Sequence, residues 1–178
     1  MNSNSVPHPS ATTDIIDSAI PLEAGDAVYT VRHERQKVVA STQASYDGMF
    51  AESVQGISVV ERLFVALHAC RLSKADSLAA HYRERLLAAG ADAGRVQAVD
   101  SVGGTTVADA RLDTMLAFTG KLILNPVEGD RAAIESLVKV GLTTPAIAAL
   151  GQLIAFLSYQ IRVAAGLKAM AAATGVAA

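Results

Sequence analysis

Cysteine is nearly absent from the sequence, which holds one such residue, Cys70, in 178. A single thiol cannot close a disulfide within the chain, and it cannot form the two-cysteine centre of a dithiol redox enzyme. Because no internal disulfide requires an oxidising compartment, we expect a cytoplasmic protein.

Aromatic residues are also scarce, and this bears on the fold class. Tryptophan is missing and aromatic residues make up 4% of the chain, whereas hydrophobic residues make up 51%. Such a composition, rich in alanine and leucine, favours helices over sheets. No stretch shows the sustained alternation of apolar and polar residues that predicts a strand. We therefore predict an all-α fold.

The sequence has no run of basic residues and no apolar run long enough for a membrane span. Its 15 basic and 17 acidic residues are mixed along the chain, so we expect no nucleic acid partner. The most apolar stretch, residues 145–161, is interrupted by polar residues and followed by Arg162. A membrane-spanning helix needs about 20 mostly apolar residues, so we expect a buried helix and no membrane partner.

The N-terminal segment differs in composition from the rest of the chain. Residues 1–13 are polar and lack the basic and apolar regions of a signal peptide, so they are predicted to form a disordered leader. Residues 14–178 are predicted to form a single domain, since this length suffices for a hydrophobic core.

Helix-start signals repeat along the middle of the chain. In each, a Ser, Thr or Asn side chain can accept a bond from the first backbone amides, and an acid follows three residues later. Four pairs fit this pattern: Ser58/Glu61, Ser73/Asp76, Thr106/Asp109 and Asn125/Glu128. With the apolar spacing they predict seven or eight helices. Expected positions are 14–20, 26–50 (one or two helices, with a break near Ser41), 58–72, 73–89, 92–100, 106–124, a start at Asn125, and Thr144 to about 172.

The segment ERLFVALHACRLSKADSLAAHYRERLLAAG, residues 61–90, resembles the core of the carboxymuconolactone decarboxylase (CMD) and AhpD-like alkylhydroperoxidase superfamily. Members of that superfamily carry a glutamate on one helix, then a turn, then a Cys-x-x-Cys pair that opens the next helix. A histidine follows four residues after the second cysteine. Here Glu61 and His81 match the glutamate and histidine, with one residue more between them than is usual. Lys74 and Ser77 occupy the cysteine positions.

The C-terminal half of the chain carries the same resemblance. Residues 112–167 are similar to peroxidase-related members of the superfamily, and the whole resemblance covers about residues 14–170. It implies an AhpD-like helical subunit that forms a homo-oligomer, commonly a dimer, trimer or hexamer. It also implies a subfamily without the cysteine pair, encoded beside or fused to a sister domain that keeps the pair.

The missing pair decides which chemistry the resemblance can carry. In the complete motif, a helix N-terminus lowers the pKa of a thiol, and the glutamate and histidine relay a proton. Lys74 and Ser77 supply no thiol. The first hypothesis is therefore a non-thiol partner or structural subunit of a peroxidase-like system that uses no cofactor.

Two enzymatic alternatives stay open. Glu61 and His81 are candidates for acid–base catalysis on a small organic acid or lactone, as in a decarboxylase, and Ser77 lies one helical turn from His81. The other alternative is weak one-cysteine antioxidant activity through Cys70. Its apolar surroundings near a helix C-terminus disfavour a thiolate, which indicates a buried, inert cysteine instead.

The same residues also have structural explanations. Glu61 completes a cap pair with Ser58, and a histidine such as His81 often packs on a helix surface without catalysing anything. Glu61 and His68 share a helix face, but no further metal-ligand pattern accompanies them, so no metal site is expected. In the final helix, polar residues that demand partners are Tyr159, Gln160 and Arg162, with Gln43 and Tyr46 as candidates to face the same space.

Overall fold

The computed structural model describes residues 14–20, 22–23, 25–101 and 107–174. The predicted leader and the predicted cap at Thr106 lie outside these residues. The described residues form nine α-helices and a short 3-10 helix and contain no strand, which confirms the all-α prediction. The elements are α1 (Ile15–Ala19), α2 (Ala27–His33), α3 (Gln36–Met49), α4 (Val59–Leu72), α5 (Asp76–Ala88), α6 (Ala93–Asp100), α7 (Ala110–Leu124), η1 (Pro126–Glu128), α8 (Arg131–Lys139) and α9 (Thr144–Ala173).

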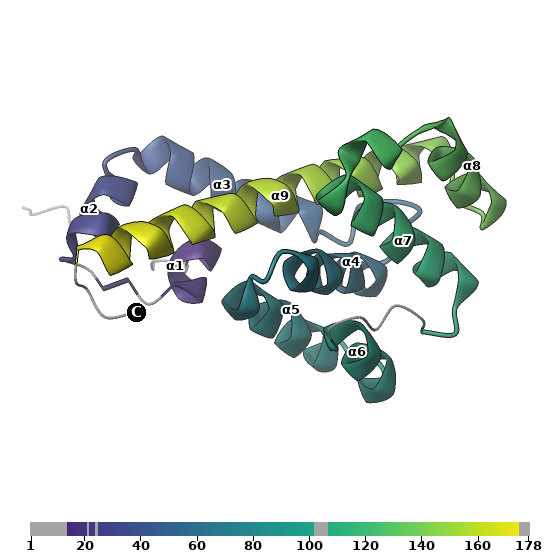
Figure 1. The fold of residues 1–178 in the computed structure, drawn as a ribbon, viewed down its shortest axis with the longest axis horizontal. Helices are drawn as coiled ribbons and strands as arrows, with labels where there is room; N and C mark the ends of the chain where they lie inside the picture. The colour runs from purple at the N-terminus through teal and green to yellow at the C-terminus, as the bar shows by residue number, and fades with distance from the viewer. Residues whose placement is uncertain (1–13, 21, 24, 102–106, 175–178) are drawn as a thin grey trace, which may run out of the picture.

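The long helix α9 runs along the whole molecule and organises the others (Figure 1). Helices α1, α2 and α3 gather around its C-terminal half, and α7 and α8 lie at its N-terminal end. Helix α4 is the centre of the core, because it packs against α5, α6, α7 and α9, and its residues 62–70 are all buried. The hairpin of α4 and α5 carries the motif that resembles the AhpD-like proteins.

Helix α9 also has the length and composition of a membrane span, since it holds 30 residues. Of its most apolar window, however, 44% is buried inside the protein. It packs against α1, α2, α3, α4, α7 and α8. The helix is thus partly buried, whereas the sequence predicts burial on most sides.

The turn between α4 and α5 departs from the prediction. Ser73 does not cap α5; it ends α4, with its amide bonded to the carbonyl of Ala69 at 3.1 Å. Lys74 takes a left-handed conformation with φ of 56°, and the amide of Ala75 returns to the carbonyl of Cys70 at 2.9 Å. The chain needs these residues to close α4, so α5 begins only at Asp76.

The other predicted helix starts are confirmed only in part. The capping box of Ser58 and Glu61 is confirmed, with both reciprocal hydrogen bonds present. Asp109 is itself the N-cap of α7 and not the third residue of the helix. Asn125 opens only the turn η1, because Asp130 caps α8 instead.

Two boundaries near the ends of the chain also refine the prediction. The predicted break near Ser41 is wrong, because α2 and α3 meet at residues 34–35 and α3 continues through Ser41. The last helix begins as predicted at Thr144, with Thr143 as its N-cap.

Candidate functional site

The positions that would hold the cysteine pair carry a different polar contact. Ser77, in the first turn of α5, accepts a hydrogen bond from Nζ of Lys168 at 2.7 Å. Lys74 is exposed in the turn before that helix. The hydroxyl of Ser77 is thus engaged by α9, and no hydrogen bond joins it to His81 among the described residues.

His81 belongs instead to a hydrogen-bonded network of three polar side chains. Its Nε2 atom lies 2.6 Å from the hydroxyl of Tyr46, and that hydroxyl accepts a bond from Nη1 of Arg85 at 2.6 Å. Because arginine can only donate, the Tyr46 hydroxyl accepts this bond. The same hydroxyl can either donate its hydrogen to Nε2 of His81 or accept a second bond from it, so the contact fits either tautomer of the histidine ring.

The electrostatic surroundings agree with a neutral His81. Burial lowers the pKa of His81, and the nearby charge of Arg85 lowers it further. Burial also raises the pKa of Tyr46, against the opposing effect of Arg85. The guanidinium of Arg85 lies over the rings of Tyr46 and Phe50, at 5.3 and 4.9 Å from their centroids. Burial and the charge of Arg85 therefore both favour the uncharged imidazole of His81.

Glu61 is not part of this hydrogen-bonded network. It accepts bonds from the amide of Ser58 at 2.7 Å and from Nε of Arg111 at 2.6 Å. Burial opposes the charge of Glu61, but the bonds from Arg111 and Ser58 outweigh burial and lower its pKa. No hydrogen bond or ion pair joins Glu61 to His81 within the described ranges, so the two residues that carry the resemblance do not form one acid–base pair here.

Arg62, the next residue along, points into the core. It is 2% exposed. Its guanidinium donates to the carbonyls of Ser58 at 3.3 Å, Met49 at 2.5 Å and Ala51 at 2.9 Å. Burial lowers the pKa of Arg62, and Arg85 adds to the effect. The buried cation of Arg62 thus ties the end of α3 to the start of α4.

Cys70 lies in the last turn of α4, and its side chain is wholly buried. Burial raises the pKa of its thiol to about 12. A thiol with such a pKa carries almost no thiolate near neutral pH, and the thiolate is the reactive form. The prediction that Cys70 is buried is confirmed.

His68 is buried on the same helix, at 5% exposure, and burial lowers its pKa. It shares no hydrogen bond with Glu61 in the described part of the chain. Within that part, no group of three or more His, Cys, Asp or Glu side chains is arranged to hold a metal ion.

The sequence alone does not reveal a buried polar pair between α5 and α9. The hydroxyl of Tyr82 donates to Oε1 of Gln160 at 2.6 Å, and both residues are fully buried. Tyr159 turns the other way, with its hydroxyl 2.9 Å from that of Thr42. The sequence does indicate that Gln160 needs a buried partner, because it is a polar residue in an otherwise apolar helix.

Four cavities of the described residues lie away from Glu61 and His81, and one of them touches Ser73 in the turn before α5. One of about 370 Å³ separates α7 from α8, and one of about 330 Å³ lies between α3 and α9. Two smaller ones, of about 190 and 210 Å³, lie beside α9 and beside α1. Neither Glu61 nor His81 lines any of these four.

Comparison with known proteins supports the fold. No family model matches the sequence, and no curated protein matches it. Among solved structures, the chain is similar to an uncharacterized peroxidase-related protein from Silicibacter sp. TM1040, with a TM-score of 0.71. The two share 17% sequence identity, and the match covers 89% of this chain and 94% of that one. The chain therefore has the all-helical fold of a peroxidase-related protein.

Proposed function

We propose that this chain is a CMD/AhpD-like protein that has lost thiol chemistry and acts as a non-redox subunit, as a homo-oligomer and beside a sister protein that keeps the cysteine pair. The observation that carries the proposal is the turn before α5. There Lys74 and Ser77 stand at the cysteine positions, and the Ser77 hydroxyl is bound by Lys168. The one thiol of the chain, Cys70, is wholly buried.

Peroxide reduction by the family chemistry needs two thiols at that turn. A thiolate attacks one peroxide oxygen, the other oxygen leaves as water or alcohol, and the attacking cysteine becomes a sulfenic acid. A second thiol then displaces water to form the disulfide, which an external dithiol reduces. Ser77 cannot carry the first step, since a hydroxyl is not oxidised and recycled in this way.

A gain-of-function experiment tests the proposal. The natural chain is expected to consume no hydrogen peroxide or organic hydroperoxide with a dithiol as reductant. The double variant Lys74→Cys/Ser77→Cys is expected to form a disulfide and to consume peroxide. A matched control places the same spacing at another exposed helix start, Ala132→Cys/Glu135→Cys on α8, and is expected to stay inactive. Dithiol-dependent peroxide consumption by the natural chain, abolished by Cys70→Ala, would overturn the proposal.

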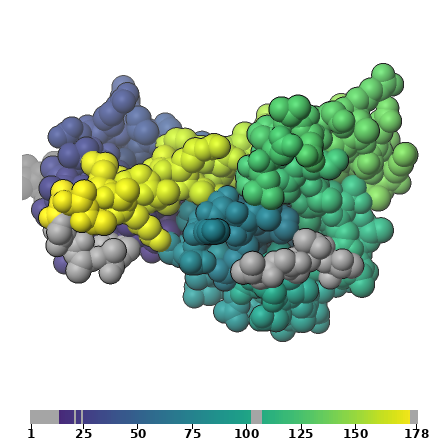
Figure 2. Space-filling model, in the orientation of Figure 1, coloured from purple at the N-terminus to yellow at the C-terminus, as the bar shows by residue number. Residues whose placement is uncertain are grey.

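Association of subunits rests on apolar side chains at one end of the molecule. The end formed by α2, α3 and the last turns of α9 extends from the main body (Figure 2). Val31 is 50% exposed there, and Val38 and Met170 are each 43% exposed. Light scattering is expected to show an oligomer that Val38→Glu weakens. Val127→Glu, at a residue 87% exposed near the other end, is the matched control and is expected to leave the mass unchanged.

The sister protein is tested by mixing the chain with a Cys-x-x-Cys relative encoded beside it. Light scattering is expected to show a complex heavier than either protein alone. A homo-oligomer that ignores the relative would contradict the partner role and leave the oligomer intact.

A second candidate function, acid–base catalysis on a small organic acid or lactone, is favoured by one observation. Arg85 and Tyr46 hold the ring of His81 in a fixed orientation, and burial lowers the pKa of His81. In the tautomer that donates from Nε2 to Tyr46, Nδ1 stays free to take a proton, as a general base requires. In a screen of such substrates, His81→Gln is expected to abolish any turnover, whereas Glu61→Gln is expected to retain it. Equal loss in both variants would instead support the original pairing of Glu61 with His81.

A further inference from the structure

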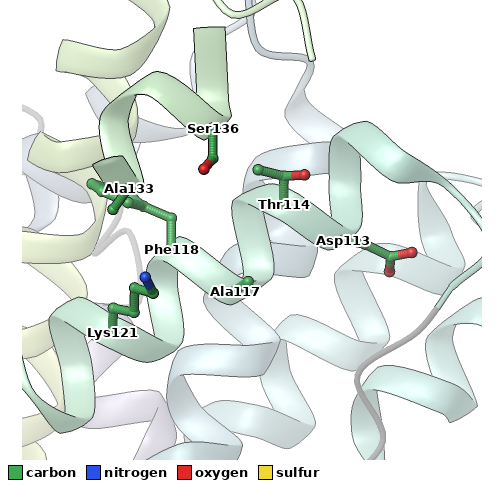
Figure 3. A pocket seen from close by; sticks show the side chains of 7 residues that line it. All are labelled: Asp113, Thr114, Ala117, Phe118, Lys121, Ala133 and Ser136. Atoms are coloured by element: carbon green, nitrogen blue, oxygen red, sulfur yellow. The ribbon is translucent and has the colours of Figure 1, made fainter. Parts of the chain in front are cut away.

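The cavity between α7 and α8 lies outside the hairpin that carries the family motif (Figure 3). Its volume of about 370 Å³ falls within the size range of small-molecule sites. Phe118, Ala117 and Ala133 give it an apolar surface. The polar residues on its walls are Asp113, Thr114, Lys121 and Ser136.

The two hydroxyls of the cavity are able to accept hydrogen bonds. Thr114 donates its hydrogen to the carbonyl of Ala110 at 2.7 Å, and Ser136 donates its hydrogen to the carbonyl of Ala132 at 2.9 Å. Because a hydroxyl has one hydrogen, each then offers only lone pairs to the cavity. In Figure 3 the Ser136 hydroxyl points from α8 into the space between the helices. A ligand that satisfies these oxygens must bring a donor of its own.

The charges of the cavity lie at opposite ends. Lys121 is half-buried, extends its amine toward the cavity, and makes no hydrogen bond or ion pair with any described residue. The carboxylate of Asp113 accepts a bond from the amide of Val107 at 2.8 Å. The two residues are about 12 Å apart along α7. An anionic group is therefore favoured at the Lys121 end and repelled at the Asp113 end.

We propose that this cavity binds a small hydroxy acid. The ligand's carboxylate pairs with Lys121, its apolar body lies on Phe118 and Ala117, and its hydroxyl donates to Ser136 or Thr114. This site is independent of the proposed function, since it shares no residue with the turn before α5 or with the hydrogen-bonded network of His81.

Calorimetric titration with mandelate tests the proposal, because mandelate carries a carboxylate, a hydroxyl and an apolar ring. Phenylacetate lacks the hydroxyl and mandelamide lacks the charge. Mandelate is expected to bind. Mandelamide is expected to bind at least about tenfold more weakly, the effect of one lost charge-assisted bond, and phenylacetate about fivefold more weakly, the effect of one lost neutral hydrogen bond. Equal affinity for mandelate and mandelamide would overturn the proposal, as would no binding of mandelate up to about 10 mM.

Variants locate the site. Lys121→Gln is expected to weaken mandelate binding at least about tenfold, whereas Lys139→Gln, on an exposed lysine of α8, is expected to leave it unchanged. Ala117→Leu fills the cavity from an exposed position and is expected to abolish binding without unfolding the protein. Circular dichroism checks the fold of each variant. Binding that survives both Lys121→Gln and Ala117→Leu would place the ligand elsewhere and refute the site.

Discussion

The hydroxyl of Tyr46 lies 2.6 Å from Nε2 of His81, so a polar contact ties α3 to α5 across 35 positions of sequence. The same hydroxyl accepts a bond from Arg85 at 2.6 Å. Tyr46 therefore joins Arg85 to His81 and holds the ring of His81 in one orientation.

Replacing Tyr46 by phenylalanine is expected to lower the free energy of unfolding by about 1 kcal/mol, because it removes two hydrogen bonds and leaves a partly buried guanidinium without its acceptor. Urea denaturation measures the change. Tyr29→Phe is the matched control, since the Tyr29 hydroxyl makes no hydrogen bond to the described residues, and its effect is expected to stay below about 0.5 kcal/mol. Equal losses in both variants would mean that the contact contributes nothing.

Stability is expected to fall as the pH drops below about 6.5, the ordinary pKa of histidine. The pKa of His81 and that of His68 are both lowered by burial, and that of His81 also by Arg85. The unfolded chain therefore takes up protons at a higher pH than the folded one, which favours unfolding on acidification. Urea midpoints at about pH 7.5 and about pH 5.5 measure the loss. His81→Gln is expected to reduce this pH dependence; an unchanged dependence in His81→Gln and in His68→Gln would contradict the assignment.

The sequence predicts the helices well because their signals are local. The cap of Ser58 by Glu61 involves residues three apart, and the structure forms both of its bonds. Ser73 and Asp76 have the same spacing, but here the preceding helix uses Ser73 and Lys74 to end itself. A cap pattern shows that a helix can start at a residue; it does not show that the previous helix has already finished.

The site is harder to predict because its contacts join distant segments. Tyr46 and His81 are 35 residues apart and Tyr82 and Gln160 are 78 apart, so no periodicity reports them. Composition does indicate that a polar Gln160 in an apolar helix needs a partner, but not which one. Glu61 illustrates the reverse case, since its match to a motif predicts a role beside His81 while its local cap and Arg111 account for its contacts.

Cys70 is expected to resist alkylation in the folded protein. Its side chain is wholly buried and its pKa is raised to about 12, so neither access nor thiolate is available near neutral pH. Mass spectrometry after treatment with iodoacetamide is expected to find no adduct in the native protein and complete modification in guanidinium. Rapid alkylation of the native protein would revive the one-cysteine alternative.

Arg62→Ala is expected to lower the free energy of unfolding by about 3 kcal/mol, because it removes a charged donor from three part-buried carbonyls and leaves a cavity beside α3. The matched control is Arg131→Ala, whose side chain is 92% exposed and, among the described residues, pairs with Glu135 on the same helix. An exposed pair contributes at most about 1 kcal/mol, and the control is expected to stay below that value. Chemical denaturation compares the two. A loss in Arg62→Ala no larger than in the control would show that Arg62 does not hold the end of α3.

Variants of Glu61 distinguish a structural role of this residue from a catalytic one. Glu61→Ala removes the capping box and the pair with Arg111, and is expected to lower the free energy of unfolding by about 1 to 2 kcal/mol. Glu61→Gln can keep the capping box but not the charge, so its loss of unfolding free energy is expected to be about half as large.

The decisive measurement is the titration of His81 followed by NMR. Since Arg85 lowers the pKa of His81 and Glu61 makes no contact with it, Arg85→Gln is expected to raise that pKa and Glu61→Gln to leave it unmoved. A shift in Glu61→Gln as large as that in Arg85→Gln would show that the two motif residues are coupled after all.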